Sequence, residues 1–247
     1  MRKVWAIIRR ELIAYFSSPL AYIVMTAFLL MQGYIFYLIV SFLNNPQTPS
    51  MTPLRLFFGG TIFFWLFLLF VVPVITMRLI AEERRSGTIE VLLSSPVTEV
   101  QVVVGKFAAA MAFYAALWLP TVLYVLVLRR NSEIDIGPVL AGYLGVFLLG
   151  FFFLAVGTFC SNLTNTQLIA AIIAFAAMVA LFSIGLVEQL MISSSVIKSA
   201  LSHMNLWTQM DDFAKGIVDT RHVIYQLSGG VLFLFLAAKS LEVKKWR

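Results

Sequence analysis

The chain has 247 residues, of which 61% are hydrophobic and only 12% are charged. Soluble domains are about 45–50% apolar and about 25% charged, so this composition excludes a soluble enzyme, a disordered chain and a nucleic-acid-binding domain. One cysteine and two histidines exclude a disulfide framework, a cysteine-based metal site and a histidine-rich metal centre. The composition therefore predicts a polytopic membrane protein.

Six apolar runs are long enough to cross a bilayer. A helix rises about 1.5 Å per residue, so a hydrocarbon core of about 30 Å takes roughly 20 residues. We expect an all-α polytopic membrane protein with an N-terminal segment (residues 1–19), a six-span transmembrane domain (residues 20–241) and a short tail (residues 242–247). The expected spans are residues 20–42, 56–77, 102–128, 139–160, 168–187 and 223–241.

Proline positions support this division. Pro19 stands at the entry of the first span and Pro138 opens the fourth, where a missing N–H is tolerated best. Pro73 and Pro120 lie inside the second and third spans, where we expect kinks that neighbouring helices stabilise. No internal repeat is visible, so the inverted-repeat pattern of many secondary transporters is not supported.

The N-terminal segment predicts an amphipathic helix. Six of its side chains, Val4, Trp5, Ile8, Leu12, Tyr15 and Phe16, fall within an arc of about 120°, and its basic side chains lie on the other side. A basic face opposite Trp, Leu and Phe is typical of a helix that lies in the headgroup plane. Such a helix either only anchors the chain or acts as a lever on the first span. The residues assigned to this interfacial helix are Trp5, Ile8, Arg9, Arg10, Leu12 and Phe16.

The distribution of basic residues predicts the orientation. Lysine and arginine are concentrated in the N-terminal segment, the loop after the second span and the C-terminal tail, whereas acidic residues are shared equally between the two sides. By the positive-inside rule, these basic segments face the cytoplasm. The net charge of +6 then lies on the cytoplasmic side, and both termini are inside, as an even number of spans requires.

The most informative segment is the cytoplasmic loop after the second span, residues 78–101. A charged run, Glu82-Glu83-Arg84-Arg85, ends at Gly87, and a short apolar stretch then ends at Pro96. Ile89, Leu92 and Leu93 stand at helical spacing, and this stretch is too apolar for a purely solvated loop. A short amphipathic helix of this kind is suited to docking in a groove of another protein.

Residues 78–96 and the following Gly105-Lys106 resemble the signature of ABC-2-type transporter permeases. That signature has a charged stretch, a Gly-Thr-Ile-Glu core, a Pro and a Gly-Lys pair between the second and third spans. Residues 10–22 resemble more narrowly the permeases associated with gliding motility. The resemblance implies the ABC-2 (type V exporter-like) fold in a bacterial plasma (inner) membrane. It also implies a homodimer or heterodimer of six-span subunits, each resting on a cytoplasmic ABC ATPase, with an extracytoplasmic accessory protein as a further candidate partner.

In this family the loop between the second and third spans contains the coupling helix that sits in the ATPase. The segment of residues 188–221 corresponds to short re-entrant or interfacial helices on the outer side. The loop of residues 161–166 is either a minor ATPase contact or a tight turn that Asn162 caps. By resemblance, the ATPase-coupling residues are Glu82, Glu83, Arg84, Arg85, Gly87, Thr88, Ile89, Glu90, Leu92, Leu93 and Pro96.

The chain lacks a phosphate-binding loop of its own. The pattern G-x-x-x-x-G-K-[ST] would need Gly at the position of Val100 and Ser or Thr at that of Phe107. We therefore expect no enzyme activity and no bound cofactor or metal in this chain, with ATP and Mg held by the partner ATPase. The expected function is that of the permease subunit of an ATP-driven exporter.

Three other functions are weighed against this one. An ion-coupled secondary transporter normally carries ionisable residues near the bilayer centre, and the first five spans have no central Asp, Glu, Lys or Arg. An intramembrane metalloprotease would need histidines near Glu82-Glu83, but His203 and His222 lie on the opposite side. A non-transporting membrane anchor or mechanical subunit of a larger complex is compatible with the same composition.

Overall fold

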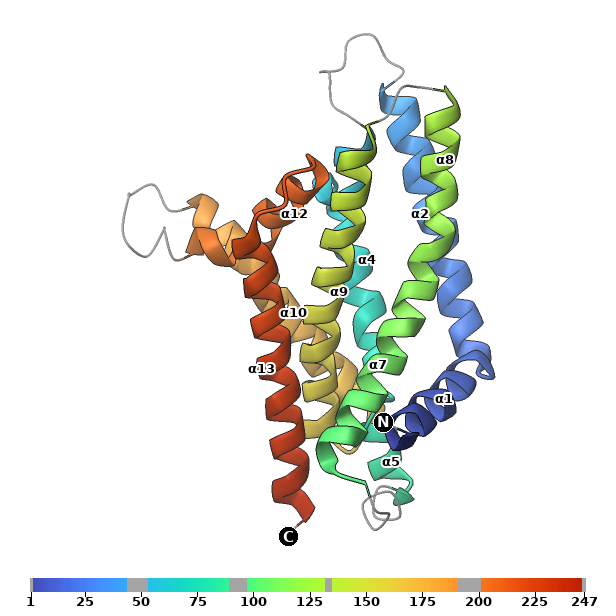
Figure 1. Ribbon diagram of the computed structural model, residues 1–247, viewed down its shortest axis with the longest axis vertical. Helices are drawn as coiled ribbons and strands as arrows, with labels where there is room; N and C mark the ends of the chain where they lie inside the picture. The colour runs from blue at the N-terminus through green and yellow to red at the C-terminus, as the bar shows by residue number, and fades with distance from the viewer. Residues whose placement is uncertain (1, 44–52, 89–96, 132–134, 191–200, 246–247) are drawn as a thin grey trace.

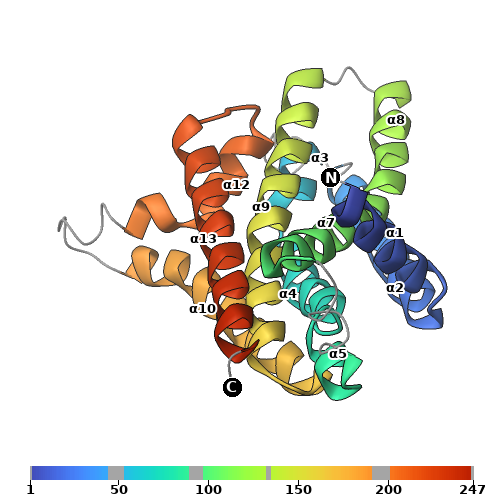
Figure 2. The ribbon, with the colours of Figure 1, turned by 60° about the horizontal axis from the view of Figure 1, so that its bottom comes forward.

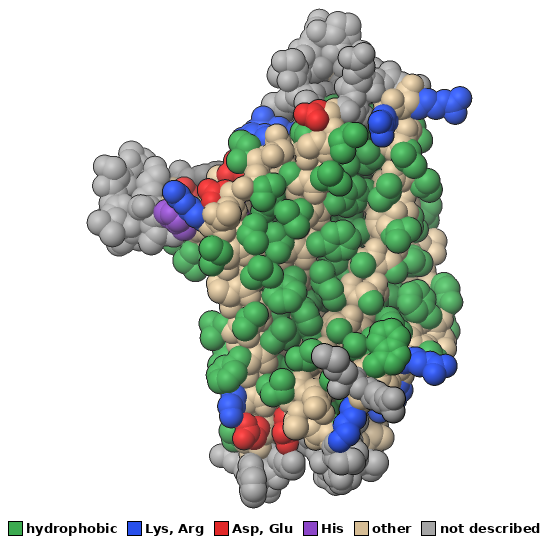
Figure 3. Space-filling model, viewed as in Figure 1, with side chains coloured by type: hydrophobic (Ala, Val, Ile, Leu, Met, Phe, Trp, Pro, Cys, Tyr) green, Lys and Arg blue, Asp and Glu red, His purple; other side chains and the backbone are tan. Residues whose placement is uncertain are grey.

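The computed structural model describes residues 2–43, 53–88, 97–131, 135–190 and 201–245. Every regular element in these ranges is helical, and six helices are long and apolar enough to cross a membrane. The expected all-α, six-span architecture is therefore confirmed. Figure 3 shows hydrophobic side chains over the middle of the bundle and charged side chains towards its two ends.

The helices follow the expected apolar runs in chain order. An N-terminal helix, α1 (Arg2–Phe16), precedes the first long helix, and a five-residue helix, α5 (Ala81–Arg85), follows the second span. The other elements are α2 (Pro19–Leu43), α3 (Pro53–Arg55), η1 (Leu56–Gly60), α4 (Ile62–Thr76), α7 (Glu99–Trp118), η2 (Leu119–Thr121), α8 (Val122–Asn131), α9 (Ile136–Leu163), α10 (Gln167–Leu190), α12 (Leu206–Ala214) and α13 (Thr220–Lys245).

The second span differs from the expected continuous helix over residues 56–77. Phe58 has non-helical backbone angles and Gly59 has a φ of 107°, so the helix breaks between η1 and α4. Glycine adopts this φ at little cost because it has no Cβ. A Cβ on Gly59 would also stand 2.6 Å from Cγ of Met210 in α12. The break therefore accommodates a segment about 150 residues later in the chain, a contact that no local pattern can indicate.

The two internal prolines behave differently. Pro120 lies in the 3₁₀ turn η2, which separates α7 from α8 as the sequence led us to expect. The hydroxyl of Thr121 donates a hydrogen bond to the Trp118 carbonyl at 2.6 Å and so satisfies a group near the break. Pro73 lies inside α4, and that helix continues to Thr76.

The central helix of the bundle is α9. It contacts α4, α7, α10, α12 and α13, and Figure 2 shows these helices arranged around it. Close approach depends on small residues, since helices in lipid associate by backbone proximity and packing. At Gly145, for example, an added Cβ would stand 2.8 Å from the Phe213 ring of α12.

The two ends of the bundle carry different elements. Figure 1 shows α1, α5 and the C-terminal part of α13 at one end, which we name the α1–α5 end. The opposite end carries α12 and the C-terminal part of α8. The α1–α5 end is where the sequence predicts contact with an ATPase.

Candidate functional site

At the α1–α5 end, the short helix α5 is fixed to three other helices and to the turn that precedes it. We name this site the α5 junction. Its members come from α1, the α4–α5 turn, α5, α7 and the C-terminal end of α9. They are Arg10, Glu11, Arg78, Glu82, Glu83, Arg84, Lys106, Ser161 and Asn162.

Lys106 of α7 is the centre of a buried ion cluster in this junction. Its Nζ lies 3.0 Å from Glu11 Oε1 of α1 and 3.0 Å from Glu83 Oε1 of α5. Arg10 of α1 contacts the same two carboxylates, at 2.7 Å and 2.6 Å. The Lys106 side chain is only 2% exposed, and the Glu11 and Glu83 side chains are 14% and 15% exposed. An unpaired charge at such depth would be strongly destabilising, so the two cations and two anions depend on one another.

The cluster keeps its members on α1 charged. The pKa of Glu11 lies below its ordinary value. Burial alone would raise it, but the charge of Lys106 and hydrogen bonds from Arg10 and Lys106 outweigh that effect. Burial also acts to lower the pKa of Arg10, and its contacts with Glu11 and Glu83 raise the pKa above the ordinary value. Both side chains are therefore ionised at neutral pH.

Gly105, next to Lys106, allows α1 to lie directly on α7. A Cβ at this position would stand 2.8 Å from Cγ2 of Ile7, which is buried. Ile7, Glu11 and Tyr15 are spaced by four residues and form the ridge of α1 that faces the bundle. The Tyr15 hydroxyl donates to the Ile75 carbonyl at 2.8 Å, and its ring stacks on Phe113 with centroids 5.0 Å apart. Gly105 thus leaves the space that α1 needs, and Lys106 provides the charge that binds α1 to α7.

The predicted interfacial residues lie mainly away from that ridge. Trp5 is 67% exposed and Phe16 is 39% exposed. Ile8 and Leu12 are half-buried, and Arg9 and Arg10 are exposed. The helix therefore has a buried ridge against α7, which takes Tyr15 from the predicted apolar arc, whereas Trp5 and Phe16 of that arc point outward.

Two polar residues at the end of α9 fix α5 from the other side. Ser161 Oγ accepts from the backbone N–H groups of Ile80 and Ala81, both at 3.2 Å. Asn162 accepts from Arg84 Nη2 through its side-chain oxygen and donates to the Ala237 carbonyl of α13 at 2.7 Å. A short turn does join α9 to α10 at residues 164–166, but Asn162 does not cap it, because α9 continues to Leu163 and Asn162 is fully buried.

The predicted coupling residues divide into an inner and an outer set. Glu83 and Arg84 face the junction, and Glu82 pairs with Arg78 at 3.1 Å. The outer set comprises Arg85, Gly87 and Thr88, which are exposed, and Gly87 has a φ of 70°. Outside the described residues lie Ile89, Glu90, Leu92, Leu93 and Pro96.

Sequence reasoning missed the inward partners Glu11, Lys106 and Ser161. The available signal was Lys106, the one charged residue of α7 beyond its first turn, since a buried charge requires a partner. The partner could not be identified from sequence, because Glu11 and Lys106 are separated by 95 positions.

The opposite end of the bundle contains described parts of the segment 188–221, and its helix α12 is packed into the bundle. One face of α12 is buried against α9 and η1. Arg55 binds Asp211 of α12 with two hydrogen bonds, at 2.6 Å and 3.1 Å. His222 contacts Asp212 at 3.1 Å, and among the described residues no group of three His, Cys, Asp or Glu could hold a metal. Since α5 lies at the other end (Figure 1), the histidines and Glu82 are not brought together.

Comparison with known families agrees with this architecture. A family model described as ABC-2 family transporter protein matches residues 52–207, which is more than half of the chain. The matched region includes α5, Lys106 and the polar end of α9, and it does not include α1. No curated protein gives a significant match. With its six helices able to span a membrane, the chain is a multi-pass membrane protein that belongs to the ABC-2 family of transporter proteins.

Proposed function

We propose that the chain is the permease subunit of an ATP-driven exporter whose energy comes from a separate cytoplasmic ATPase. The observation that carries this proposal is the α5 junction. The helix Ala81–Arg85 is fixed to α1 and α7 through Glu83 and to α9 through Ser161. The residues that follow it, Gly87 and Thr88, are exposed. A partner that binds the segment after α5 would therefore be able to move α1, α7 and α9.

The proposed mechanism is a two-state bundle biased by the ATPase. ATP-driven closure of the partner moves the segment of residues 86–97, and α5 transmits this movement to α1, α7 and α9. The cluster around Lys106 makes α1, α5 and α7 move together, because separating them would leave buried charges unpaired. Nucleotide chemistry takes place in the partner, since this chain has no phosphate-binding loop.

The basic residues orient the assembly in the proposal. The α1–α5 end faces the cytoplasm of a bacterial cell, with both termini inside and the segment around α12 outside. The partners are an ABC ATPase and a second permease subunit, identical or different, in the inner membrane. Service in gliding motility is supported only by the likeness of residues 10–22 to that group of permeases.

Co-purification followed by ATPase measurement tests the proposal. We expect Leu92→Ala and Glu90→Ala to lower substrate-stimulated ATP hydrolysis at least several-fold while the ATPase still co-purifies. The matched control is Leu140→Ala, which truncates an exposed leucine of α9 on the side proposed to be external and should leave hydrolysis unchanged. Full coupling after replacement of all of residues 88–93 would show that this segment is not the interface.

The main alternative is a non-transporting membrane anchor. An anchor would also co-purify with its partners, but reconstituting it would not change their ATP hydrolysis. A dependence of transport on a proton gradient, without ATP, would instead favour a secondary transporter.

A further inference from the structure

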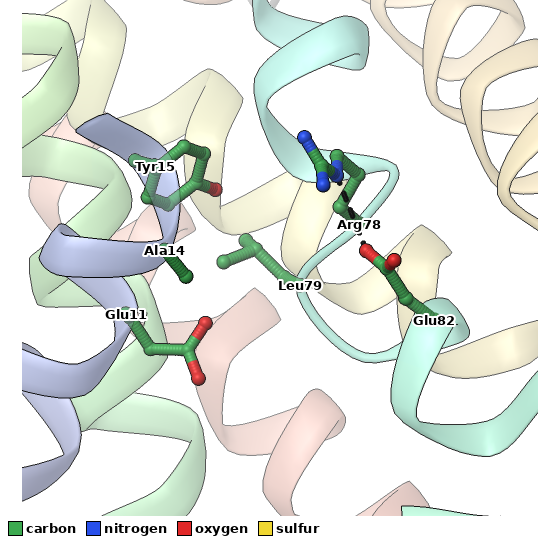
Figure 4. Close-up of a pocket in the computed structure, with 6 residues that line it drawn as sticks. All are labelled: Glu11, Ala14, Tyr15, Arg78, Leu79 and Glu82. Carbon is green, nitrogen blue, oxygen red and sulfur yellow. Dashed lines mark hydrogen bonds and ion pairs between the residues drawn. The ribbon is translucent and has the colours of Figure 1, made fainter. Parts of the chain in front are cut away.

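Two adjoining clefts lie at the elbow between α1 and α2. The first, which we call the polar cleft because three charged side chains stand in its wall, is lined by Glu11, Ala14, Tyr15, Arg78, Leu79 and Glu82. Figure 4 shows the α1 residues on one side of this cleft, with Arg78 and Leu79 of the α4–α5 turn and Glu82 of α5 on the other.

The second cleft is apolar and continues from the first between α2 and α4. Tyr15 and Arg78 line both clefts, so the two share a wall. The other lining residues include Leu20 and Ala21 of α2 and Val74 of α4. Leu20 is exposed at the surface of the bundle. A polar cleft at the end of the spans that continues into an apolar one between spans has the layout of a headgroup and an acyl chain.

Arg78 is only partly used by the protein. Its Nε donates to Glu82 at 3.1 Å and its Nη1 donates to Ser18 at 2.9 Å. Among the described residues, its Nη2 makes no hydrogen bond within the protein, and its side chain is 29% exposed. A guanidinium with free N–H groups in a fixed plane is well suited to a phosphate.

Glu82 supplies the complementary negative charge. Its side chain is 45% exposed and pairs with Arg78 alone among the described residues, through Oε2. Glu11 also lines the cleft, but its charge is already balanced by Arg10 and Lys106. Arg78 and Glu82 pair with each other through Nε and Oε2, so Nη2 of Arg78 and Oε1 of Glu82 are left to bind the two charges of a zwitterionic headgroup.

We propose that the two clefts together hold one phospholipid with a primary ammonium headgroup. Its phosphate lies against Arg78, its ammonium lies against Glu82, and one acyl chain lies along the open apolar cleft. A phosphatidylcholine headgroup has no N–H to donate to Glu82, and a phosphatidylglycerol headgroup brings no positive charge. The bound lipid joins α1 to the end of α4, and this assignment does not depend on ATP or on transport.

Native mass spectrometry of the full-length, delipidated protein in detergent tests the proposal. Phosphatidylethanolamine, phosphatidylcholine and phosphatidylglycerol with the same acyl chains are titrated separately. We expect one phosphatidylethanolamine per chain, bound at least tenfold more tightly than either of the other lipids. Glycerophosphoethanolamine, which has the headgroup without acyl chains, should bind at least tenfold more weakly than the whole lipid.

Paired variants locate the site. Ala14→Trp fills the polar cleft without removing a charge, and Ala6→Trp adds the same side chain at another exposed position of α1. We expect Ala14→Trp to weaken phosphatidylethanolamine binding at least tenfold, whereas Ala6→Trp retains the affinity. Arg78→Gln should also weaken it, with Arg85→Gln, on exposed α5 surface, as the control for loss of a cation.

The comparison of lipids with the unmodified chain gives a result even if a variant fails to fold. Equal binding of the three lipids, or equal loss in Ala14→Trp and Ala6→Trp, would overturn the proposal. Equally tight binding of glycerophosphoethanolamine and the whole lipid would show that the apolar cleft holds no acyl chain, which would also overturn it.

Discussion

Replacing Lys106 with methionine tests whether the buried ion cluster holds α1 on the bundle. Methionine keeps most of the length and volume of the side chain and removes its charge. The change leaves the carboxylates of Glu11 and Glu83, about 15% exposed, with a single cation, Arg10. Arg10 is 52% exposed, so it cannot fully replace a cation that was buried between them.

The magnitude follows from the burial of the cluster. Removing one partner of a buried ion pair costs about 3–5 kcal/mol, because the other partner is left without compensation. Arg10 retains its contacts at 2.7 Å and 2.6 Å, which places Lys106→Met near the lower limit of that range. A loss of about 3 kcal/mol lowers the thermal midpoint by roughly 6–12 °C in a chain of this size.

Thermal unfolding of the detergent-purified protein measures this effect. The matched control is Lys239→Met, because Lys239 also pairs with a glutamate, Glu242, but the two side chains are 57% and 47% exposed. An exposed pair contributes at most about 1 kcal/mol. The double variant Lys106→Met/Glu83→Gln keeps the pair of Arg10 and Glu11. We therefore expect it to be more stable than the sum of its single losses predicts, by about 0.5–3 kcal/mol.

Two results would refute the reasoning about the cluster. One is a midpoint for Lys106→Met within 2 °C of the unmodified chain. The other is strict additivity of the Lys106→Met and Glu83→Gln losses, which would mean that the two side chains do not stabilise each other.

Three further predictions concern the same end of the bundle. Gly105→Ala should lose about 1–3 kcal/mol of stability, because its added Cβ would overlap Ile7. Gly137→Ala is the control and should be tolerated, because the nearest atom to its added Cβ is 3.6 Å away. Equal thermal midpoints for the two variants would contradict this prediction. Asn162→Ala should cost about 1–3 kcal/mol, measured in the same assay, because it removes a buried hydrogen bond to Ala237 and the side-chain acceptor of Arg84. The lowered pKa of Glu11 means that its ionised form stabilises the fold. Its stability difference from Glu11→Gln should stay constant from neutral pH down to the ordinary glutamate value of 4.5 and shrink as the pH falls further; a difference that grows with acid would contradict the assignment.

The six long helices could be predicted because membrane crossing imposes a length and composition that a single segment must meet alone. Residues 139–160, for instance, contain no charged residue, and they form part of α9. Pro120 could be interpreted in the same local way, since its effect on a helix depends on its own ring and missing N–H. The break at Gly59 could not be predicted, because it depends on the side chain of Met210.

The charged run after the second span shows where local reasoning ends. The sequence marks residues 82–85 as an unusual density of charge, which favours a surface for a partner. The structure directs Glu83 to Lys106 and Arg84 to Asn162. The choice between facing a partner and facing the bundle depends on residues 23 and 78 positions away, and no spacing rule within the segment encodes that choice.

The central claim is that the exposed residues after α5 contact an ATPase, and site-directed cross-linking tests it directly. The single cysteine of the chain, Cys160, is buried, so an introduced cysteine can be labelled selectively. We predict that Thr88→Cys, carrying a photoactivatable cross-linker, becomes linked to the co-purified ATPase. Ile217→Cys, which is exposed beyond α12 at the opposite end, should not become linked. Absence of a cross-link from Thr88→Cys, or equal cross-linking from both positions, would contradict the account.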